Sequence, residues 1–309
     1  MNLPNILKNR HNQAIFALIV ANLIWGAASP IFKLALQNIT PFTLAFIRFF
    51  GATILIFPFC ISNLSIERKD WLKLVLLSFF GITVNISFFF LGLKYAPSIN
   101  APIIGSSGPV FLYLFSILIL HEKRHYKVLI GTIISLLGVL IIIGQPLLTN
   151  SLDGQILGNL FFVLAMLGAI GHAIVSKEIL PKYSAQSITF WSFLIGSITF
   201  LPMAAFEILN YNSLTSLDYR GWTGIIFGVL FSSLTGYFLF EWALKNMEVQ
   251  EVGIFTYIDP IAAILIAMPL LGETITPIFL IGSILVFGGI IVAEGRLHYH
   301  PIHKLKSNF

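Results

Sequence analysis

The sequence predicts an all-α membrane protein of ten transmembrane helices, built as two inverted five-helix repeats. Three observations support this fold class: an apolar composition, ten long apolar stretches and an internal repeat of uncommon residues. Hydrophobic residues make up 57% of the 309 residues, and only 10% are charged. A typical soluble domain has about 25% charged residues, and it needs a polar exterior. The composition therefore excludes a soluble protein.

The apolar stretches have the length of membrane-spanning helices. A span needs about 20 residues, because each adds ~1.5 Å across a hydrocarbon core of ~30 Å. Long continuous apolar runs indicate helices, whereas barrel strands show short alternating segments. The first run follows basic residues as a signal peptide does, but it is too long for one and nine more spans follow it. We expect spans at residues 14–36, 41–61, 71–95, 98–120, 127–144, 156–176, 187–206, 221–244, 252–272 and 276–294.

The basic residues predict the orientation of these spans. Of the 18 Lys and Arg residues, Lys94 and Arg220 lie in the expected outer connections, and Lys33 and Arg48 lie within spans. The other fourteen all lie in the expected inner loops and tails. By the positive-inside rule, both termini face the cytoplasm of a cell inner (plasma) membrane. The formal charge of +5 therefore reflects topology, and we expect no nucleic-acid partner.

An internal repeat divides the chain into residues 14–144 and 156–295. At an offset of 151, uncommon residues coincide without a gap, and Lys33 matches Lys177 at an offset of 144. The coinciding pairs are Trp71 and Trp222, Lys94 and Lys245, Pro109 and Pro260, Glu122 and Glu273, Gly131 and Gly282, and Gly138 and Gly289. Because each repeat has five helices, the second enters the membrane from the opposite side. Such inverted repeats recur in secondary transporters, although duplication also builds channels and membrane enzymes.

The order of these residues resembles the EamA-type family of the drug/metabolite transporter superfamily over residues 14–295. The first half carries Trp25-Gly26, Lys33, Pro41, Arg48, Pro109, Glu122, Gly131 and Gly138, and the second repeats Pro260, Glu273, Gly282 and Gly289. It departs from the pattern with Ala169 and Ser192, near where the tryptophan and arginine would fall. The resemblance implies a secondary carrier for metabolites, amino acids or drugs, often acting in export. It does not identify the substrate.

Two matching prolines predict helix breaks at membrane depth. One follows Gly105-Ser106-Ser107-Gly108, and the other follows Tyr257-Ile258-Asp259. Proline removes a backbone donor and disturbs the preceding turn, which leaves carbonyl groups without partners. In transporters such groups meet substrate, ions or water. We therefore expect Gly108 and Asp259 near a shared cavity, with a purely structural kink as the alternative.

Charged residues within spans are costly and usually functional. Arg48 and Asp259 each lie about 10 Å from a helix end by the helical rise, so either is a candidate for a charged substrate group. Asp259 is also a candidate for a coupling proton. Lys33 is close enough to the outer end of its helix to reach the interface. An i,i+4 salt link to Lys245 explains Glu241 at least as well as a role in transport does.

Polar and aromatic residues at depth complete the candidate site. Trp25 offers a flat wall, and Asn85, His172 and Tyr237 offer hydrogen bonds. A lone histidine within the membrane is more often an interhelical donor than a titrating group. Glycine and serine at every fourth position of 224–236 predict a face for close helix packing. The predicted substrate-binding residues are Trp25, Lys33, Arg48, Asn85, Gly108, His172, Tyr237 and Asp259.

Catalytic signatures are missing from the sequence. It contains no HExxH, no GxSxG and no phosphate-binding P-loop. We therefore expect no enzyme activity, cofactor or metal. The predicted function is secondary transport of small metabolites, amino acids or drugs, as export by alternating access. Its partners are a small-molecule substrate, membrane lipid and a candidate coupling proton, in a monomer or homodimer. An integral membrane enzyme or a channel is the alternative.

Overall fold

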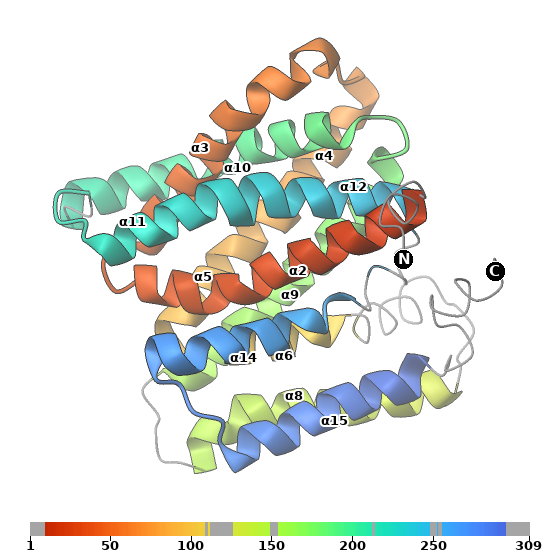
Figure 1. The fold of residues 1–309 in the computed structure, drawn as a ribbon, viewed down its shortest axis with the longest axis vertical. Helices are drawn as coiled ribbons and strands as arrows, with labels where there is room; N and C mark the ends of the chain where they lie inside the picture. The colour runs from red at the N-terminus through yellow and green to blue at the C-terminus, as the bar shows by residue number, and fades with distance from the viewer. Residues whose placement is uncertain are drawn as a thin grey trace, which may run out of the picture.

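The computed structural model describes residues 10–108, 111, 126–148, 154–211, 214–247, 252 and 255–294, and every regular element within these ranges is helical. Figure 1 shows the helices lying roughly side by side. The first half contains α2 (Arg10–Ala35), α3 (Pro41–Cys60), η1 (Ile61–Asn63), η2 (Arg68–Asp70), α4 (Trp71–Ser78), η3 (Phe79–Val84), α5 (Asn85–Tyr95), α6 (Asn100–Ser106) and α8 (Tyr126–Leu148). The second contains α9 (Gln155–Ile179), α10 (Ala185–Tyr211), α11 (Tyr219–Ile226), η4 (Phe227–Tyr237), α12 (Phe238–Asn246), α14 (Ile258–Leu271) and α15 (Pro277–Glu294).

Membrane-length helices dominate the described residues. Seven are long and apolar enough to cross a bilayer: Arg10–Ala35, Pro41–Asn63, Arg68–Tyr95, Leu129–Leu147, Gln155–Ser176, Ala185–Tyr211 and Tyr219–Asn246. Two shorter apolar helices are Ile258–Leu271 and Pro277–Ala293. Many exposed side chains are large and apolar, such as Phe59, Leu209 and Leu265. This surface suits contact with lipid, where a soluble protein would need polar groups.

Two of the long helices contain a π-helical segment. The segment η3 joins α4 to α5, and η4 joins α11 to α12. At the repeat offset of 151, Phe79–Val84 corresponds to residues 230–235, which lie within η4. π-Helical turns are rare and concentrate at functional sites, because they change which backbone carbonyls are paired within the helix. The described parts of the two halves thus share this irregularity at matching positions.

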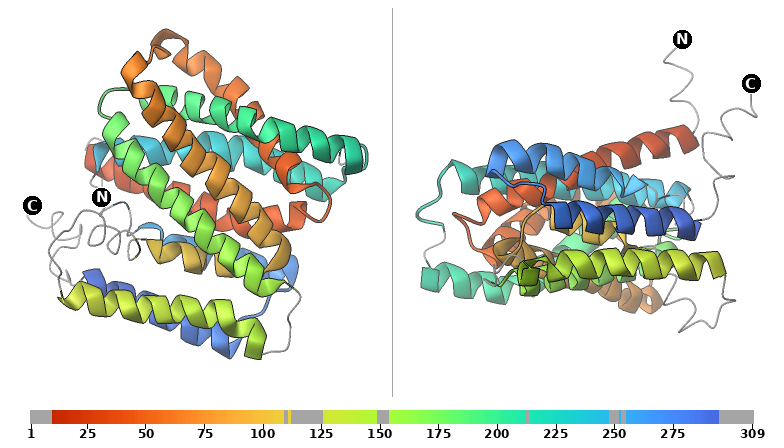
Figure 2. Two further views of the ribbon diagram at one scale, coloured as in Figure 1. Left: turned by 180° about the vertical axis from the view of Figure 1, so that it is seen from behind. Right: turned by 90° about the horizontal axis from the view of Figure 1, so that it is seen from below.

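Glycine pairs bring α8 and α15 together as an antiparallel pair. A Cβ atom at Gly131 would overlap the carbonyl oxygen of Gly289, and one at Gly138 would lie 2.5 Å from the carbonyl oxygen of Gly282. Since Gly131 matches Gly282 and Gly138 matches Gly289 in the repeat, the two contacts are crossed. Figure 2 shows this pair from behind and from below. Only glycine permits so close a backbone approach.

The segments that precede the two matching prolines lie beside each other. Ser107 follows the end of α6, and a turn at Thr256 and Tyr257 precedes α14. The Ser106 hydroxyl donates to the Thr256 carbonyl over 3.4 Å. Pro260 lies in the first turn of α14, where a backbone N–H has no acceptor within the helix. The helix therefore begins just before this proline instead of bending at it. Pro109 and Glu122 lie outside the described residues.

The predicted small-residue face packs mainly against α2. A Cβ atom at Gly224 would overlap Ala35, and one at Gly236 would lie 2.7 Å from the Trp25 Nε1 atom. At Gly228 the nearest atoms belong to Phe32 and to Arg48 of α3. Helices α11 to α12 therefore approach α2 along its length, as Figure 1 shows. This close approach brings the candidate residues of three helices together.

Candidate functional site

An aromatic pair lies between α2 and η4. The Trp25 Nε1 atom donates to the Ser232 carbonyl over 3.1 Å. The Tyr237 hydroxyl donates to the Gly81 carbonyl over 3.2 Å. The two rings meet edge to face with their centroids 5.3 Å apart, a favoured geometry for aromatic pairs. The sequence predicted both residues, and the structure places them in contact.

The carbonyls that bind this pair belong to the two π-helical segments. Gly81 lies in η3 and Ser232 in η4, and the two positions match at the repeat offset of 151. Each π-helical segment thus gives one carbonyl to an aromatic side chain from another helix. The acceptors of these two hydrogen bonds are backbone carbonyls, which cannot be predicted as binding partners from the sequence. They explain why an irregular backbone is tolerated at membrane depth.

Arg48 is buried on one side of the aromatic pair, with 2% of its surface exposed. Its Nε atom donates to the Ser233 hydroxyl over 2.6 Å, and Nη2 donates to the Ser232 hydroxyl over 3.0 Å. The guanidinium carbon lies 4.9 Å from the Phe32 ring centroid and 4.7 Å from that of Phe49, within cation–π range. Within the described residues Arg48 forms no ion pair. A buried cation of this kind suits an anionic ligand group.

His172 also packs beside Tyr237, with the ring centroids 6.2 Å apart. Its Nε2 atom lies 2.6 Å from the Glu241 Oε1 atom, and Nδ1 lies 3.3 Å from the Leu77 carbonyl oxygen. The expected salt link between Glu241 and Lys245 is wrong. Lys245 instead donates to the Tyr183 carbonyl over 2.9 Å. Glu241 is buried, whereas Lys245 is exposed at the end of α12, so the two side chains occupy different surroundings.

We use the name central cluster for Trp25, Arg48, His172, Tyr237 and Glu241. Four of the five were predicted from the sequence, and Glu241 was missed as a site residue. The signal that marks it is its spacing, because Tyr237 and Glu241 lie four residues apart and therefore share one helix face. Ser232 and Ser233 were missed as partners of Arg48. Serine is common in membrane helices, so the sequence alone does not single out these two residues. Their role becomes visible only in their hydrogen bonds with Arg48.

Lys33 belongs to a separate network near the expected outer surface. It donates to the Ala96 carbonyl, and its Nζ atom lies 3.5 Å from the Glu273 Oε1 atom. Glu273 also accepts hydrogen bonds from the backbone N–H groups of Ser98 and Ile99. Lys33 therefore has a carboxylate partner where the sequence suggested that it reaches the interface. It lies about 12 Å along α2 from Trp25 by the helical rise, outside the central cluster.

The remaining predicted residues lie around the central cluster. Asn85 donates to the Ala165 carbonyl over 2.7 Å and so joins α5 to α9. Gly108 faces α9, where a Cβ atom would lie 3.7 Å from Met166. Asp259 packs against α2, since a Cβ atom at Gly26 would lie 2.6 Å from its carbonyl oxygen. Its Oδ1 atom is buried and has no hydrogen-bond partner among the described residues.

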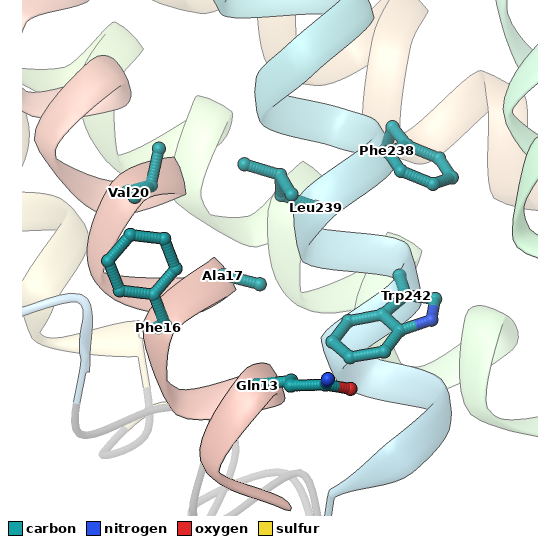
Figure 3. Close-up of a pocket in the computed structure, with 7 residues that line it drawn as sticks. All are labelled: Gln13, Phe16, Ala17, Val20, Phe238, Leu239 and Trp242. Atoms are coloured by element: carbon teal, nitrogen blue, oxygen red, sulfur yellow. The ribbon is translucent and has the colours of Figure 1, made fainter. Parts of the chain in front are cut away.

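An apolar groove of about 300 Å³ runs between α2 and α12 (Figure 3). Its lining residues are Gln13, Phe16, Ala17, Val20, Phe238, Leu239 and Trp242. It contains no residue of the central cluster. Phe16 is largely exposed, so the groove opens at the apolar surface of the protein. Its lining is apolar apart from the Gln13 amide and the Trp242 indole N–H, so it offers few groups for recognising a polar solute.

Comparisons with known proteins agree with this architecture. The EamA-like transporter family matches residues 12–144 and again residues 156–294. The chain is 28% identical to "Uncharacterized transporter YetK" of Bacillus subtilis, with 93% of this chain and 88% of that protein covered. It is 25% identical to "Probable amino-acid metabolite efflux pump" of Escherichia coli, with 95% and 98% covered.

A solved crystal structure shares the fold. It superposes with a TM-score of 0.63 at 18% sequence identity and covers 93% of this chain and 99% of that chain. At this identity the likeness concerns the fold alone. The double family match spans most of the sequence, and the relatives are named as transporters or efflux pumps. This chain is therefore a small-molecule transporter that belongs to the EamA-like transporter family.

Proposed function

We propose that this transporter exports small carboxylate-bearing solutes, of the amino-acid metabolite class, and holds them at the central cluster. The observation that carries the proposal is Arg48, a buried cation with two serine partners and no ion pair in the described part of the chain. An arginine fork binds a carboxylate through parallel hydrogen bonds. Trp25 and Tyr237 supply aromatic surface in the same cluster. The relatives named as amino-acid metabolite efflux pumps favour this class.

The proposed architecture is ten transmembrane helices in two inverted halves, residues 14–144 and 156–295. In an arrangement with two-fold symmetry, residue i contacts residue j and the equivalent of j contacts the equivalent of i. The crossed glycine contacts between α8 and α15 follow this rule. The matching positions of η3 and η4 support the same arrangement. An inverted repeat predicts alternating access by rocking of the halves around a central site.

The outer network of Lys33 supports a closed outer side. Glu273 connects α2 with the backbone at Ser98 and Ile99. These segments come from both halves, so rocking to the outward-open state separates them. We propose that the network holds the outer side shut while the substrate enters from the cytoplasm. The matching position in the first half, Glu122, is the expected inner counterpart.

The proposed location is the cell inner membrane, with both termini in the cytoplasm. Helix α2 begins and α15 ends on the same side of the bundle, as Figure 1 shows. The strong excess of Lys and Arg in the loops on that side supports its cytoplasmic placement. Membrane lipid covers the apolar surface.

Asp259 is proposed as a second ligand group for a substrate cation. Asn85 and Gly108 are proposed to shape the helices around the site.

A ligand-stabilisation screen tests the proposed substrate class. Purified protein is melted in the presence of each amino acid and of the corresponding amine, which lacks the carboxylate. A ligand at 100 times its Kd stabilises the folded state by about 2.7 kcal/mol. We expect the carboxylates to raise the melting temperature and the amines not to. An equal effect of acid and amine contradicts the role of Arg48.

Measurement of solute flux in proteoliposomes distinguishes a carrier from a channel and from a membrane enzyme. A carrier exchanges labelled for unlabelled substrate across the membrane, so counterflow is expected. A channel conducts without counterflow, and a membrane enzyme changes the solute chemically. The family favours the carrier over the enzyme. Recovery of a chemically altered solute argues against the proposal, as does flux without counterflow.

A further inference from the structure

The buried pair of His172 and Glu241 has a chemistry that the substrate proposal does not use. We propose that this pair binds the proton that is coupled to transport, and that release of this proton separates the two side chains. The inference rests on the proposed function, because a coupling proton has meaning only in a secondary transporter. It names a proton-binding site for which the sequence suggested Asp259 alone.

The contact needs one shared proton. The Leu77 carbonyl oxygen can only accept, so the Nδ1 atom of His172 carries a hydrogen. Nε2 lies 2.6 Å from the Glu241 Oε1 atom, which requires a single hydrogen between the two atoms. That hydrogen makes either an imidazolium with a carboxylate or a neutral imidazole with a carboxylic acid. Because both atoms share it, this hydrogen belongs to the pair and not to either residue alone.

While the Nδ1 atom keeps its hydrogen on the Leu77 carbonyl, loss of the shared proton leaves two acceptors facing each other. The Nε2 lone pair would then meet a carboxylate oxygen at hydrogen-bond distance, where nothing attractive remains. Both residues are buried, with 5% and 2% of their surfaces exposed, so solvent screens this repulsion little. The Glu241 Oε2 atom has no hydrogen-bond partner among the described residues. The deprotonated pair is therefore expected to open and to move α9 away from α12.

The pair is joined to the proposed substrate site through Tyr237. The His172 ring meets the Tyr237 ring edge to face, and Tyr237 meets Trp25 in the same way. Tyr237 also lies one helical turn from Glu241 on the same chain segment. A movement of α12 that follows proton release thus changes the aromatic surface against which a substrate binds. This contact gives proton and substrate a common conformational element.

Other charged groups around the pair have partners elsewhere in the described residues. Lys245 on α12 donates to the Tyr183 carbonyl, and Lys73 on α4 pairs with Glu178 at 2.7 Å. Between Arg10 and Lys33, the titratable residue on helix α2 is His11, in the first turn of the helix. On the other packed elements, the buried titratable groups are Tyr237 on η4 and Glu207 on α10, whereas Lys94 and Tyr95 on α5 and Tyr211 on α10 are exposed. Arg48 lies on the neighbouring helix α3. Tyr237 donates to Gly81, Arg48 binds two serines, and Glu207 accepts from Thr43. Ser176, one turn along α9 from His172, adds only a weak contact of 3.5 Å to Glu241.

Infrared difference spectroscopy on the reconstituted full-length protein tests the proposal. The probe is the proton itself, as pH or pD is varied over the whole range in which the protein stays folded. We expect imidazole and carboxyl bands to change together in one transition. Glu241→Gln should abolish the joint transition, because the amide cannot share the proton and no carboxyl group then changes together with the imidazole. His172→Gln should abolish it as well, and it provides the test if Glu241→Gln does not fold.

Glu207→Gln is the matched control. Glu207 is also a buried glutamate within the membrane helices, but its Oε2 atom accepts from the backbone N–H and the hydroxyl of Thr43 and faces no imidazole. Its substitution should leave the coupled transition unchanged. Persistence of the transition in folded Glu241→Gln or His172→Gln overturns the proposal, and so does its loss in Glu207→Gln. Wild-type protein without coupled bands overturns it equally.

The ligand-stabilisation screen tests the proposed substrate class independently of the infrared experiment, which tests the proton site. If no carboxylate stabilises the protein but the coupled bands appear, the substrate class is wrong and the proton site stands. If carboxylates stabilise the protein but the bands are absent, the substrate site stands and the proton site is wrong. Each measurement therefore decides one of the two proposals.

Discussion

The His172 ring occupies the space that a side chain at Gly81 would need. A Cβ atom placed on Gly81 would overlap the Nδ1 atom of His172. The carbonyl of the same glycine accepts the Tyr237 hydroxyl. Gly81 is thus the point of η3 where two residues of the central cluster meet the backbone. Its lack of a side chain lets α9 and η4 approach together.

Gly81→Ala is therefore expected to destabilise the protein. The added methyl displaces His172 and disturbs its contacts with Leu77 and Glu241. Overpacking of a tight interior typically costs about 1–3 kcal/mol. Thermal unfolding in detergent measures this effect. Gly105→Ala is the control, since a Cβ atom there meets no described atom within 4 Å. A melting temperature equal to that of the control would show that His172 is free to move aside.

Two adjacent glycines of α15 give a second prediction. A Cβ atom at Gly289 would overlap the Ser135 nitrogen, whereas one at Gly288 meets no described atom within 4 Å. We expect Gly289→Ala to separate α8 from α15 and to lower the melting temperature. Gly288→Ala should be neutral or stabilising by up to about 1 kcal/mol, because alanine favours the helix over glycine. Equal effects of the two substitutions would contradict the close backbone contact between these helices.

The third prediction concerns Arg48. Arg48→Lys keeps the positive charge but loses the planar fork that binds two oxygens of one carboxylate. We expect carboxylate binding to weaken at least tenfold, which corresponds to about 1.4 kcal/mol. The shift of melting temperature with ligand concentration measures this loss. Lys69→Arg, a change at an exposed residue, is the control for charge alone. Unchanged affinity in Arg48→Lys would place the carboxylate elsewhere.

Helix positions were predictable because each span must bury its backbone within one continuous apolar run. The expected span 71–95 coincides with the described residues Trp71–Tyr95. The π-helical segment η3 inside it was not predictable, since its apolar residues fit an ordinary helix equally well. Trp25 and Arg48 were predictable as rare residues at depth.

The pairing of His172 with Glu241 was not predictable from the sequence. The two residues are 69 positions apart, and only the packing of α9 against α12 brings them together. Glu241 has a nearer basic neighbour in the sequence, Lys245, and local spacing favours that link. Burial decides against it, because Glu241 faces the interior. Long-range contacts of this kind depend on the whole fold.

Chemical labelling tests the orientation. Ser216 lies exposed between α10 and α11, and Lys69 lies exposed between α3 and α4. The single native cysteine, Cys60, is buried, and Cys60→Ser removes its reactivity. In that background we expect a membrane-impermeant thiol reagent to label Ser216→Cys in intact cells and to label Lys69→Cys only after lysis. The reverse pattern would place both termini outside the cytoplasm.

The last prediction separates the roles of Asp259 and Glu241. The Asp259 backbone is fixed against Gly26, and its Oδ1 atom is buried without a hydrogen-bond partner among the described residues. A buried carboxylate oxygen without a donor is costly, and a substrate ammonium would supply the missing partner. Asp259→Asn keeps the shape of the side chain and removes its charge. We therefore expect this variant to fold with a melting temperature close to that of the wild type, and to lose stabilisation by substrates that carry an ammonium group.

The same variant should keep the coupled imidazole and carboxyl bands, because these arise from His172 and Glu241. Glu241→Gln should show the converse, with the joint change of the bands lost and amino acids, which carry both a carboxylate and an ammonium group, still bound. Loss of the coupled bands in Asp259→Asn would assign the coupling proton to Asp259, as the sequence suggested. Unchanged binding of every ammonium ligand would instead make Asp259 a structural residue at the start of α14, where an acidic side chain favours the first turn of a helix.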